Sequence, residues 1–473
     1  MTVVLLIDAI VVISLVVASR RRLEDALPVF CFFLVLMPLE SRIVIPGLFD
    51  LGTDRVAILT LLVLFFLRGK RGNSGAIPLK RLMYLHIAWA ICSTLYSLSV
   101  ATSMKQLIGQ VIEYYLLYYI LFRVISDTRT VYKILYAMMI AMGLCSILGL
   151  LEAYASWSVL TIFPSNLWNT YGRVDPLYIE WGRGLRIRST FPHPILFGDA
   201  LAMGIPIALY LLSTRKQAWP KFVLWVTLLL MFWAIYKTSS RGPWLAVGVS
   251  SVFLFLLVRN RVRRYLTVIG LFVVMVLVTR PGVWQTIANL YESTQDKASP
   301  IGSSYEYRHA LTHAITRAVA KDPGRFMLGY GLGTFREKGL DIDFLGDVRH
   351  WYTCDNNWDV FLYETGYGGL LIVGALLISP LLMTLRNYQR LPRPEKYLSG
   401  VFFISLAGFY FMLLSVAGYS WGQQGFMAWI FISLSVVYPR IAARERRASA
   451  TLKTPLEVAL AVPAPQIPAV QFL

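Results

Sequence analysis

Long apolar segments recur along the whole sequence and limit what the chain can fold into. Thirteen of them lie at about residues 2–18, 26–39, 55–68, 82–99, 107–122, 131–154, 192–213, 219–236, 243–258, 264–279, 358–385, 397–416 and 424–438. A helix needs about 20 mostly apolar residues to cross the hydrocarbon core of a bilayer. In lipid, a lone strand or loop would leave backbone N–H and C=O groups without hydrogen bonds, so we expect each segment to be helical. The sequence therefore predicts an all-α integral membrane protein with about 13 transmembrane helices.

The composition also argues against a water-soluble protein. Hydrophobic residues make up 57% of the chain and charged residues only 15%, whereas a soluble domain carries about 25% charged residues. The formal net charge is +19, which in a soluble protein would suggest a nucleic-acid partner. Here the basic residues form short clusters between apolar segments. We therefore expect them to orient the protein in its membrane, and we expect no nucleic-acid partner.

The basic clusters predict which side of the membrane each connection faces. With thirteen spans, all of these clusters fall on one side, at residues 20–22, 68–81, 123–129, 215–221, 259–264, 386–396 and 440–447. Lys and Arg are enriched in cytoplasmic connections, so this side is predicted to be cytoplasmic. The N-terminus then lies outside and the C-terminus lies in the cytoplasm.

The apolar segments and the basic clusters together divide the chain into three parts. Residues 1–155 are predicted to form N-terminal transmembrane helices, and residues 156–440 a membrane core that includes a large extracytoplasmic loop at 280–357. Residues 441–473 end in Pro- and Ala-rich sequence without periodicity, so we predict a disordered cytoplasmic tail.

The large loop is predicted to contain helices of its own. Residues 305–320 have helical spacing, with Leu311, Ile315 and Val319 on one stripe. The pair Asp322-Pro323 would end this helix.

Three arginines precede the apolar segment at 192–213 in a second outward loop. They are Arg183, Arg186 and Arg188. A helix N-terminus favours anions through its free N–H groups and its dipole, and the planar guanidinium group suits phosphate oxygens. The pattern indicates an anion site. Anchoring to lipid head groups, or solvation of the loop, is the alternative.

A very short outward turn separates the segments at 219–236 and 243–258. It reads Lys237-Thr-Ser-Ser-Arg241-Gly-Pro-Trp. Charge so close to the hydrocarbon is costly and is usually paired or functional. The turn therefore supplies Arg241 as a second candidate for anion binding, and snorkelling of the basic side chains to the interface is the alternative.

Three acidic residues lie at the outer end of the segment at 358–385. Asp355 and Asp359 share one helical face, and Glu364 follows them. Burial and neighbouring carboxylates raise the pKa of such a group toward that of a useful base. The alternative is that acids at a helix N-terminus only complement the helix dipole.

Taken in order, these stretches resemble the O-antigen ligase and O-antigen polymerase (Wzy-type) superfamily of multi-pass envelope proteins. The resemblance covers roughly residues 180–380. It rests on four short motifs, each weak alone, that occur in the order typical of the family and on the predicted extracytoplasmic side. In this chain they are Arg188-Ser-Thr-Phe-Pro-His-Pro, Ser240-Arg241-Gly242, Arg308 with Pro323 and Gly329 to Phe335, and Asp355-Asn356 followed by Glu364-Thr365-Gly366.

The resemblance implies glycosyl transfer at the periplasmic face of a bacterial inner membrane, on a fold like that of the helical type C glycosyltransferases. The implied donor is a glycan on a polyprenyl diphosphate carrier and the implied acceptor is a sugar hydroxyl. The bilayer surrounds the protein, a chain-length regulator is a candidate partner, and neither metal nor cofactor is needed. The implied catalytic residues are Asp355, Arg188 and Arg241, and the implied substrate-binding residues are Arg186, Arg308, His350 and Asn356.

One position departs from the ligase pattern. Ligases that join O-antigen to lipid A-core typically carry His before the Asn, and this chain carries Asp355 there. The Asp-Asn pair is similar to that of capsule and exopolysaccharide polymerases, so we expect a polysaccharide polymerase with Asp355 as the base. His350, five residues upstream, is the alternative base.

Two other functions stay open at this point. An O-antigen ligase would use a lipid A-core sugar as acceptor. A transporter of lipid-linked glycan or of an anion would place its charges near the bilayer midplane on broken helices, whereas the candidate residues here cluster at one surface.

Overall fold

A computed structural model describes residues 2–43, 50–68, 75–163, 176–180, 184–258, 261–267, 269–270, 292, 300–344, 347–393, 395–420 and 422–460. Most of this chain is helical. The α-helices are α1 (Thr2–Ala18), α2 (Ala26–Leu36), α3 (Thr53–Arg68), α4 (Lys80–Leu95), α5 (Val100–Gln110), α6 (Leu117–Val124), α7 (Thr128–Ala155), α8 (Pro194–Thr214), α9 (Ala218–Lys237), α10 (Arg241–Leu257), α13 (Pro300–Ala320), α14 (Pro323–Leu328), α15 (Thr334–Lys338), α16 (Asn357–Arg390), α17 (Glu395–Met412) and α18 (Gln423–Leu460).

Short elements connect these helices. A π-helical segment, η2 (Val111–Leu116), joins α5 to α6, and three 3₁₀ turns are η1 (Leu23–Asp25), η3 (Val159–Ile162) and η5 (Gly418–Ser420). The strands form three antiparallel hairpins, β1 (Arg42–Ile43) with β2 (Leu51–Gly52), β3 (Ile179–Glu180) with β4 (Gly184–Leu185), and β5 (Leu340–Phe344) with β6 (Asp347–Trp351).

Twelve of the thirteen predicted segments coincide with helices, and the segment at 264–279 lies mostly outside the described residues. Six of the described helical stretches are long and apolar enough to cross a membrane: Val100–Val124, Thr128–Ala155, Pro194–Thr214, Ala218–Lys237, Asn357–Arg390 and Gln423–Ser449. A mostly helical fold with several candidate membrane-spanning helices is confirmed. The count of thirteen spans and their orientation stay predictions.

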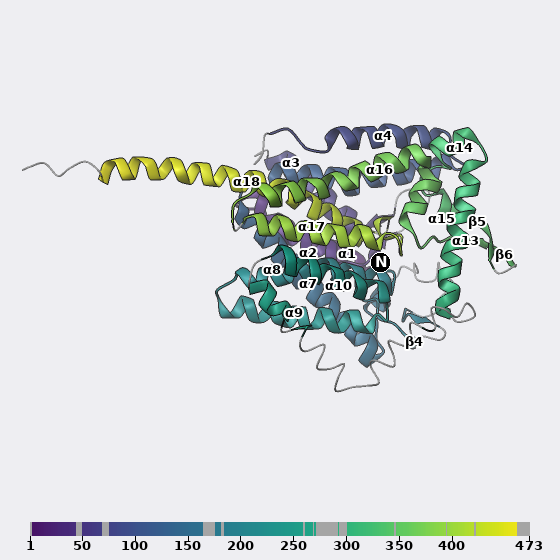
Figure 1. Cartoon of the computed structure of the whole chain (residues 1–473), viewed down its shortest axis with the longest axis horizontal. Coiled ribbons are helices and arrows are strands. Elements are labelled where there is room, and N and C mark those ends of the chain that lie inside the picture. The colour runs from purple at the N-terminus through teal and green to yellow at the C-terminus, as the bar shows by residue number, and fades with distance from the viewer. Residues whose placement is uncertain are drawn as a thin grey trace, which may run out of the picture.

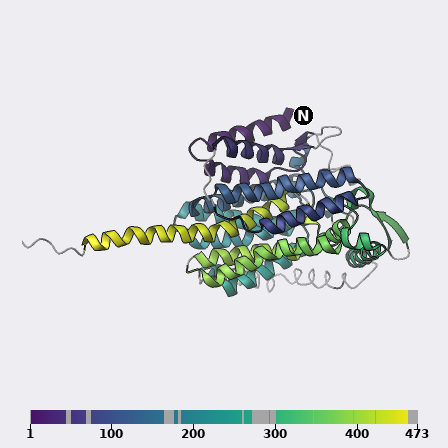
Figure 2. The ribbon, with the colours of Figure 1, turned by 90° about the horizontal axis from the view of Figure 1, so that it is seen from above.

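The long helices lie side by side in one bundle, with the N-terminal helices along one flank (Figures 1 and 2). The helix α2 packs on α7, α8 packs on α9, α10 and α17, and α16 packs on α4 and α17. The spanning window of α8 is 94% buried, whereas that of α9 is 33% buried. The helix α8 therefore forms the centre of the bundle, and α9 presents large apolar side chains such as Trp219, Phe222 and Leu229 outward, as a lipid-facing helix does.

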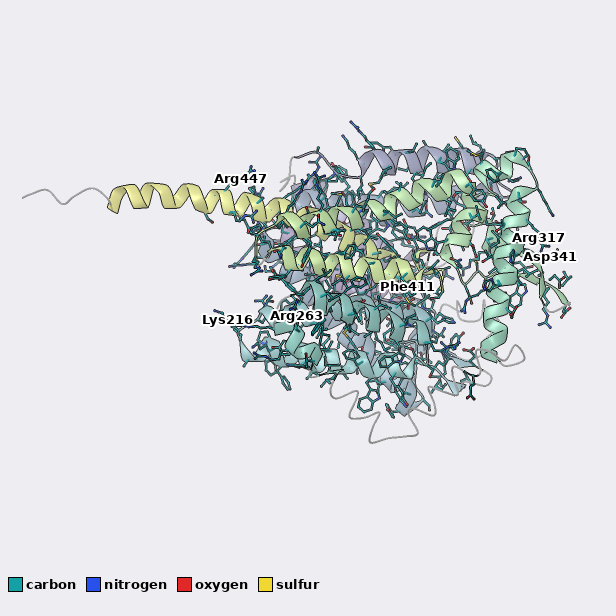
Figure 3. The ribbon with its side chains drawn as sticks, in the orientation of Figure 1. Lys216, Arg263, Arg317, Asp341, Phe411 and Arg447 are labelled. Atoms are coloured by element: carbon teal, nitrogen blue, oxygen red, sulfur yellow. The ribbon has the colours of Figure 1, made fainter. Side chains whose placement is uncertain are left out.

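The two ends of the bundle differ in their charge and in the elements that they carry. Lys216, Arg263 and Arg447, which come from three of the predicted cytoplasmic clusters, lie at one end, which we call the basic end (Figure 3). Arg317 and Asp341 of the large loop lie at the opposite end, the loop end, with α13, α14, α15 and the β5–β6 hairpin (Figures 1 and 3).

The large loop forms a small folded unit at the loop end. The predicted helix is present as α13, and Leu311, Ile315 and Val319 are fully buried as the stripe predicted. They pack in a cluster separate from the main core, with Phe335 and Ile342. The sequence analysis did not predict the β5–β6 hairpin. Residues 280–291 and 293–299 of the loop lie outside the described residues.

The helix α16 is broken at Gly366. This residue has φ +66° and ψ −175°, which interrupts the helical hydrogen bonding, and only glycine adopts such a positive φ at little cost. A Cβ at this position would also meet the backbone carbonyl of Met327 at the end of α14. The break therefore lets the large loop approach the backbone of α16.

The loop and a neighbouring helix satisfy the carbonyl groups that the break exposes. Open carbonyls inside a membrane-spanning segment are costly without hydrogen-bond donors. Backbone N–H groups of the Gly329-x-Gly331 turn supply two donors, and side chains of α4 supply two more. The bonds are Tyr330 N–H to Tyr363 O, 2.9 Å, Gly331 N–H to Glu364 O, 2.9 Å, Ser93 Oγ to Glu364 O, 2.9 Å, and Trp89 Nε1 to Thr365 O, 3.1 Å.

The C-terminal part differs from the prediction. The helix α18 continues to Leu460 and projects beyond the bundle (Figure 1), so residues 441–460 are helical where a disordered tail was predicted. The physical reason is composition, because the stretch after Arg440 is rich in Ala, Arg, Glu and Lys, which have high helix propensity and need no apolar stripe. Residues 461–473 lie outside the described residues.

Replacing Gly366 with Ala is expected to lower the apparent melting temperature of the detergent-solubilised protein. The left-handed backbone alone costs a non-glycine residue about 1–3 kcal/mol, and the new Cβ would clash with Met327. Gly374→Ala on the same helix is the matched control, because a Cβ there meets nothing within 4 Å and helix propensity favours Ala. Equal melting temperatures for the two variants would contradict this account of the break.

Candidate active site

Arg186 connects the hairpin β3–β4 to the turn between α9 and α10. Its side chain is almost fully buried. Nε donates to the carbonyl of Thr238 at 2.9 Å, Nη2 donates to Oγ of Ser240 at 2.7 Å, and Nη1 pairs with Glu180. The arginine loop and the second outward turn, which are more than 50 residues apart in sequence, therefore meet at this guanidinium group.

Arg188 is also buried, but its guanidinium group faces backbone carbonyls. Nη2 and Nε donate to the Pro176 carbonyl at 2.6 and 3.2 Å, and Nη1 donates to that of Pro192 at 3.3 Å. Its backbone N–H donates to Glu152 Oε2 at 2.8 Å. Burial raises the pKa of the nearby Glu40, and the charge of Arg188 opposes that rise. Direct contact of Arg188 with a diphosphate would require phosphate oxygens to replace these carbonyls. Arg183 lies outside the described residues.

Arg241 is the first residue of α10 and its side chain is exposed. The start of α10 lies close to the end of α17. A Cβ on Gly242 would lie 2.6 Å from Cε of Met412, at the end of α17. Gly242 therefore allows the first turn of α10, with Arg241, to pack against α17.

Asp355 and Arg308 form an ion pair at the loop end. Arg308 lies on α13 and Asp355 lies two residues before α16, and Nη2 is 3.1 Å from Oδ2. The two side chains are 30% and 39% exposed, so a ligand can reach both. Nε of Arg308 is buried and has no hydrogen-bond partner among the described residues. The exposed part of the Arg308 side chain, and not Nε, is therefore what a ligand can reach beside Asp355.

Glu180 links the Asp355 pair to the arginine loop. It pairs with Arg186, and its charge acts on Asp355. Burial raises the pKa of Asp355, Arg308 opposes the rise, and Glu180 adds to it. The charges of Arg186, Glu180, Asp355 and Arg308 alternate in sign, and Glu180 of the arginine loop lies within electrostatic reach of Asp355.

His350 points away from this arrangement. It lies on β6, where Nδ1 is 2.6 Å from Oδ1 of Asp341 and Nε2 is 2.7 Å from the carbonyl of Lys338. Both ring nitrogens thus face acceptors, and the bond to Asp341 raises the pKa of His350. An imidazole that donates from both nitrogens is protonated and has no lone pair with which to take a proton.

Asn356 is the N-cap of α16. Its Oδ1 accepts a hydrogen bond from the backbone N–H of Trp358 at 3.0 Å, and its side chain also bonds to Asp359. Asp359 in turn accepts from Oγ1 of Thr312 on α13 at 2.6 Å. The second acid of the motif thus ties α13 to α16, next to the pair of Arg308 and Asp355.

A cavity of about 110 Å³ lies between the large loop, α5, η2 and the start of α16. Amide, carboxylate, guanidinium and aromatic side chains line it, and Thr353 and Cys354 of the stretch that precedes Asp355 form one wall. The other lining residues include Gln106, Gln110, Glu113, Tyr114, Phe335, Arg336, Tyr352 and Glu364. The carboxylate of Glu364 accepts hydrogen bonds from the backbone N–H groups of Gly333 and Phe335, and Glu113 pairs with Arg55 at 2.7 Å.

Comparison with known families finds a match to part of the chain. A sequence model of the family described as O-antigen ligase matches residues 226–374. The match includes the turn with Arg241, and also Arg308, the glycine turn, Asp355 and the break in α16. This part of the chain is similar to that family, and the match supports a relationship to the O-antigen ligase and polymerase superfamily. Its members are glycosyltransferase-like enzymes that act on lipid-linked glycans in a membrane. Comparison with curated proteins finds no match.

Several residues of this candidate site were not singled out from the sequence. Glu180 was not singled out, although it lies six residues before Arg186 in the same loop. Glu113 carried a usable signal, because an acidic residue inside an apolar segment is a functional candidate by default. Nothing in the sequence marked Gln106 and Gln110, because only their place in the lining of the cavity singles them out.

The charges around Asp355 predict how its titration responds to substitution. Arg308→Gln is expected to move the titration midpoint of Asp355 to higher pH, because the variant loses the cation that stabilises the carboxylate. Glu180→Gln is expected to move the midpoint to lower pH. The measurement is labelling by a carbodiimide, which reacts with protonated carboxyl groups, followed across pH by peptide mass spectrometry.

Arg317→Gln is the control for this experiment, because Arg317 is an exposed cation on the same helix as Arg308. It is expected to leave the midpoint unchanged. A midpoint in Arg308→Gln at or below that of the unmodified protein would show that Arg308 does not control Asp355.

Proposed function

We propose that the protein is a polysaccharide polymerase that transfers a glycan from a polyprenyl diphosphate carrier to a hydroxyl group of another lipid-linked repeat unit. The polymer would be an exopolysaccharide, a capsule or an O-antigen. The observation that carries the proposal is the exposed pair of Asp355 and Arg308, which lies within electrostatic reach of Glu180 and the arginine loop and beside a polar cavity.

In the proposed reaction Asp355 is the general base. Its carboxylate accepts the proton of the acceptor hydroxyl while the hydroxyl oxygen bonds to the anomeric carbon of the donor. The bond from that carbon to the phosphate oxygen breaks, and the carrier diphosphate leaves with the electron pair. Direct displacement of this kind inverts the anomeric centre. The raised pKa of Asp355 makes its carboxylate a stronger base than an ordinary aspartate.

The cations are proposed to act on the diphosphate. Arg241 is exposed at a helix N-terminus, where the dipole adds to its charge, and the side chain of Arg308 is 30% exposed beside Asp355. Arg186 and Arg188 are buried and would add positive charge from the arginine loop. Fixed cations contribute about 3–4 kcal/mol to a transition state when they are aimed at the developing charge. They would supply charge that a divalent metal supplies in other reactions with a phosphate leaving group.

The cavity next to Asp355 is proposed to hold the acceptor sugar. Its amide and carboxylate groups suit sugar hydroxyls, and Tyr352 and Phe335 offer flat apolar surface. Thr353 and Cys354, which precede Asp355 in the chain, line the cavity, while Glu180 and Arg186 belong to the arginine loop. The acceptor and the diphosphate would thus approach the base from different sides.

The proposed location is the bacterial inner membrane, with the loop end in the periplasm and the basic end in the cytoplasm. The distribution of Lys216, Arg263 and Arg447 supports this orientation (Figure 3). The two ends of the chain, N-terminus outside and C-terminus inside, remain part of the proposal, as does a chain-length regulator as partner.

An O-antigen ligase is the second candidate, because the matching family carries that description. Both enzymes would use the same donor and the same displacement, and they differ in the acceptor. The Asp355-Asn356 pair favours the polymerase. Both ring nitrogens of His350 face hydrogen-bond acceptors, so the proposed mechanism uses Asp355 and not His350 as the base.

Asp355→Asn is expected to lower polymer formation by about 10²–10⁴-fold, the usual contribution of a general base. Arg241→Ala and Arg188→Ala are expected to shorten the polymer or abolish it. The measurement is the chain-length distribution on gels, in cells that still make the lipid-linked repeat. Asp347→Asn, an exposed acid on β6, is the control and is expected to give full-length polymer. Full polymer from all three site variants would refute the assignment.

Deletion of the gene distinguishes the two acceptors. If the protein is a polymerase, single repeats still reach their final acceptor and only longer chains disappear. Loss of all joined glycan, together with accumulation of polymer on the carrier, would identify a ligase instead. Gel analysis of lipopolysaccharide and of the carrier-linked pool in the same cells separates these outcomes.

A further inference from the structure

A groove lies at the basic end, far from the candidate active site, between the start of α2, the first turns of α7 and the connection that follows α8. It encloses about 710 Å³. Its lining contains three cations and one acid. The residues are Asp25, Pro28, Thr128, Arg129, Tyr132, Lys133, Tyr136, Ala137, Ile140 and Arg215.

The lining of the groove changes from charged to apolar along α7. Arg129 and Lys133 are one helical turn apart near the start of the helix, and Tyr136 follows on the same face. Farther along, Ala137 and Ile140 line the groove, and Ile140 is 44% exposed. One end of the groove is therefore cationic and the other end is apolar and continues onto the lipid-facing side of the bundle.

The cations are available to an anionic ligand. Arg129 is exposed and has no polar partner among the described residues. Lys133 pairs with Asp25 at 3.0 Å, but the two side chains are 49% and 33% exposed, so the pair is weak. The guanidinium group of Arg215 lies 4.5 Å from the ring centre of Tyr136, and Nε donates to the Tyr136 hydroxyl at 2.6 Å. This contact holds Arg215 over the groove.

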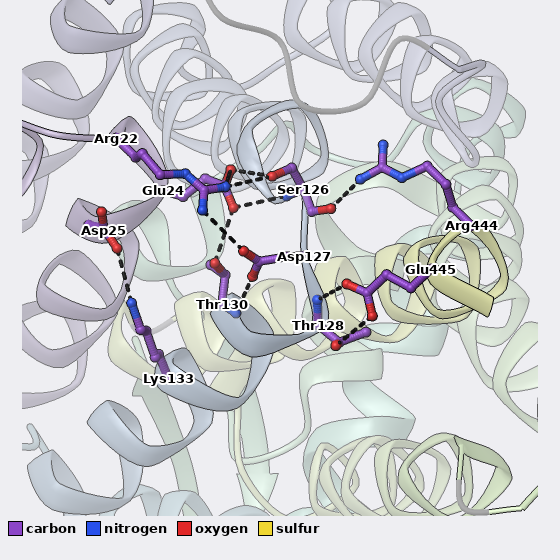
Figure 4. Close-up of polar contacts among 10 residues, drawn as sticks. All are labelled: Arg22, Glu24, Asp25, Ser126, Asp127, Thr128, Thr130, Lys133, Arg444 and Glu445. Atoms are coloured by element: carbon purple, nitrogen blue, oxygen red, sulfur yellow. Dashed lines mark hydrogen bonds and ion pairs between the residues drawn. The ribbon is translucent and has the colours of Figure 1, made fainter. Parts of the chain in front are cut away.

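The other acids of this region do not neutralise the groove. Figure 4 shows that each is engaged elsewhere. Glu24 binds Arg22, Ser126 and Thr130, Asp127 caps α7 through Thr130 and pairs with Arg22, and Glu445 of α18 accepts from the backbone and side chain of Thr128. Of the acids in this network, only Asp25 also lines the groove. The positive charge of Arg129, Lys133 and Arg215 thus exceeds the negative charge beside it.

We propose that this groove binds the head group of an anionic phospholipid from the leaflet at the basic end. Arg129, Lys133 and Arg215 contact the phosphate, and one acyl chain lies along Ala137 and Ile140. Basic pockets between transmembrane helices on the cytoplasmic side are suited to such head groups. The site is independent of the proposed glycosyl transfer.

The apolar end of the groove favours a lipid over a soluble phosphate compound as the ligand. A free phosphate or a sugar phosphate would fill only the cationic end and would leave Ala137 and Ile140 without a partner. An acyl chain covers both residues and follows the helix into the bilayer. The groove therefore has the polarity of a phospholipid that stands at the membrane surface.

The test is native mass spectrometry of the full-length protein in detergent, titrated with phosphatidylglycerol, phosphatidylethanolamine or glycerol 3-phosphate. We expect phosphatidylglycerol to bind more tightly than the other two. The double variant Arg129→Gln/Lys133→Gln is expected to bind it roughly thirtyfold more weakly, because each cation near the surface contributes about 1 kcal/mol. Lys216→Gln/Lys221→Gln removes the same charge outside the groove and is expected to bind as the unmodified protein does.

Three results would overturn the proposal. They are equal binding of the two phospholipids, binding of glycerol 3-phosphate as tight as that of phosphatidylglycerol, and unchanged binding in the double variant. If the double variant does not remain monodisperse, Arg129→Gln alone replaces it, since that side chain is exposed. A reduction in the single variant supports the site, and unchanged binding there rejects it.

Discussion

The break in α16 at Gly366 places exposed backbone carbonyls in a membrane protein, and the surrounding structure is arranged to satisfy them. Open carbonyls at this depth are tolerated only when protein or water supplies donors. Here the donors come from the glycine turn of the large loop and from Trp89 and Ser93 of α4. The large loop is therefore fixed to the bundle through backbone hydrogen bonds, and its cavity and its pair with Asp355 depend on that attachment.

The charges at the loop end alternate in sign, so each carboxylate has a cation beside it when no substrate is bound. Arg186 pairs with Glu180, and Arg308 pairs with Asp355, so neither carboxylate is left without a cation. Partly exposed ion pairs of this kind contribute little to stability. Their value in the proposed mechanism lies in position, because Asp355 is held beside a cation and keeps a raised pKa through burial and Glu180.

The features that the sequence predicted well are those with a local physical cause. Long apolar windows predicted the membrane helices, and the stripe of Leu311, Ile315 and Val319 predicted α13, because period and length are visible in the sequence itself. The grouping of Arg188, Arg241 and Asp355 rested on a resemblance and stays a prediction. The structure joins Arg186 to Ser240 by a hydrogen bond and places Glu180 within electrostatic reach of Asp355. The break at Gly366 and the role of Glu180 were not predictable, since both depend on which segments meet in space. Helical propensity alone, without apolar periodicity, explains why the tail after Arg440 was misjudged.

The base and its cation come from different parts of the fold, and this couples the proposed chemistry to the docking of the loop. Arg308 lies on α13, whereas Asp355 lies at the start of α16, and two further bonds join these elements. The hydroxyl of Tyr307 donates to the carbonyl of Thr353 at 3.0 Å, and Thr312 donates to Asp359. The positive charge of Arg308 opposes the rise in the pKa of Asp355 that burial causes, so loss of that charge alone would leave the carboxyl group protonated over a wider range of pH. The cation that α13 carries thus favours the ionised form of Asp355 that the proposed reaction requires.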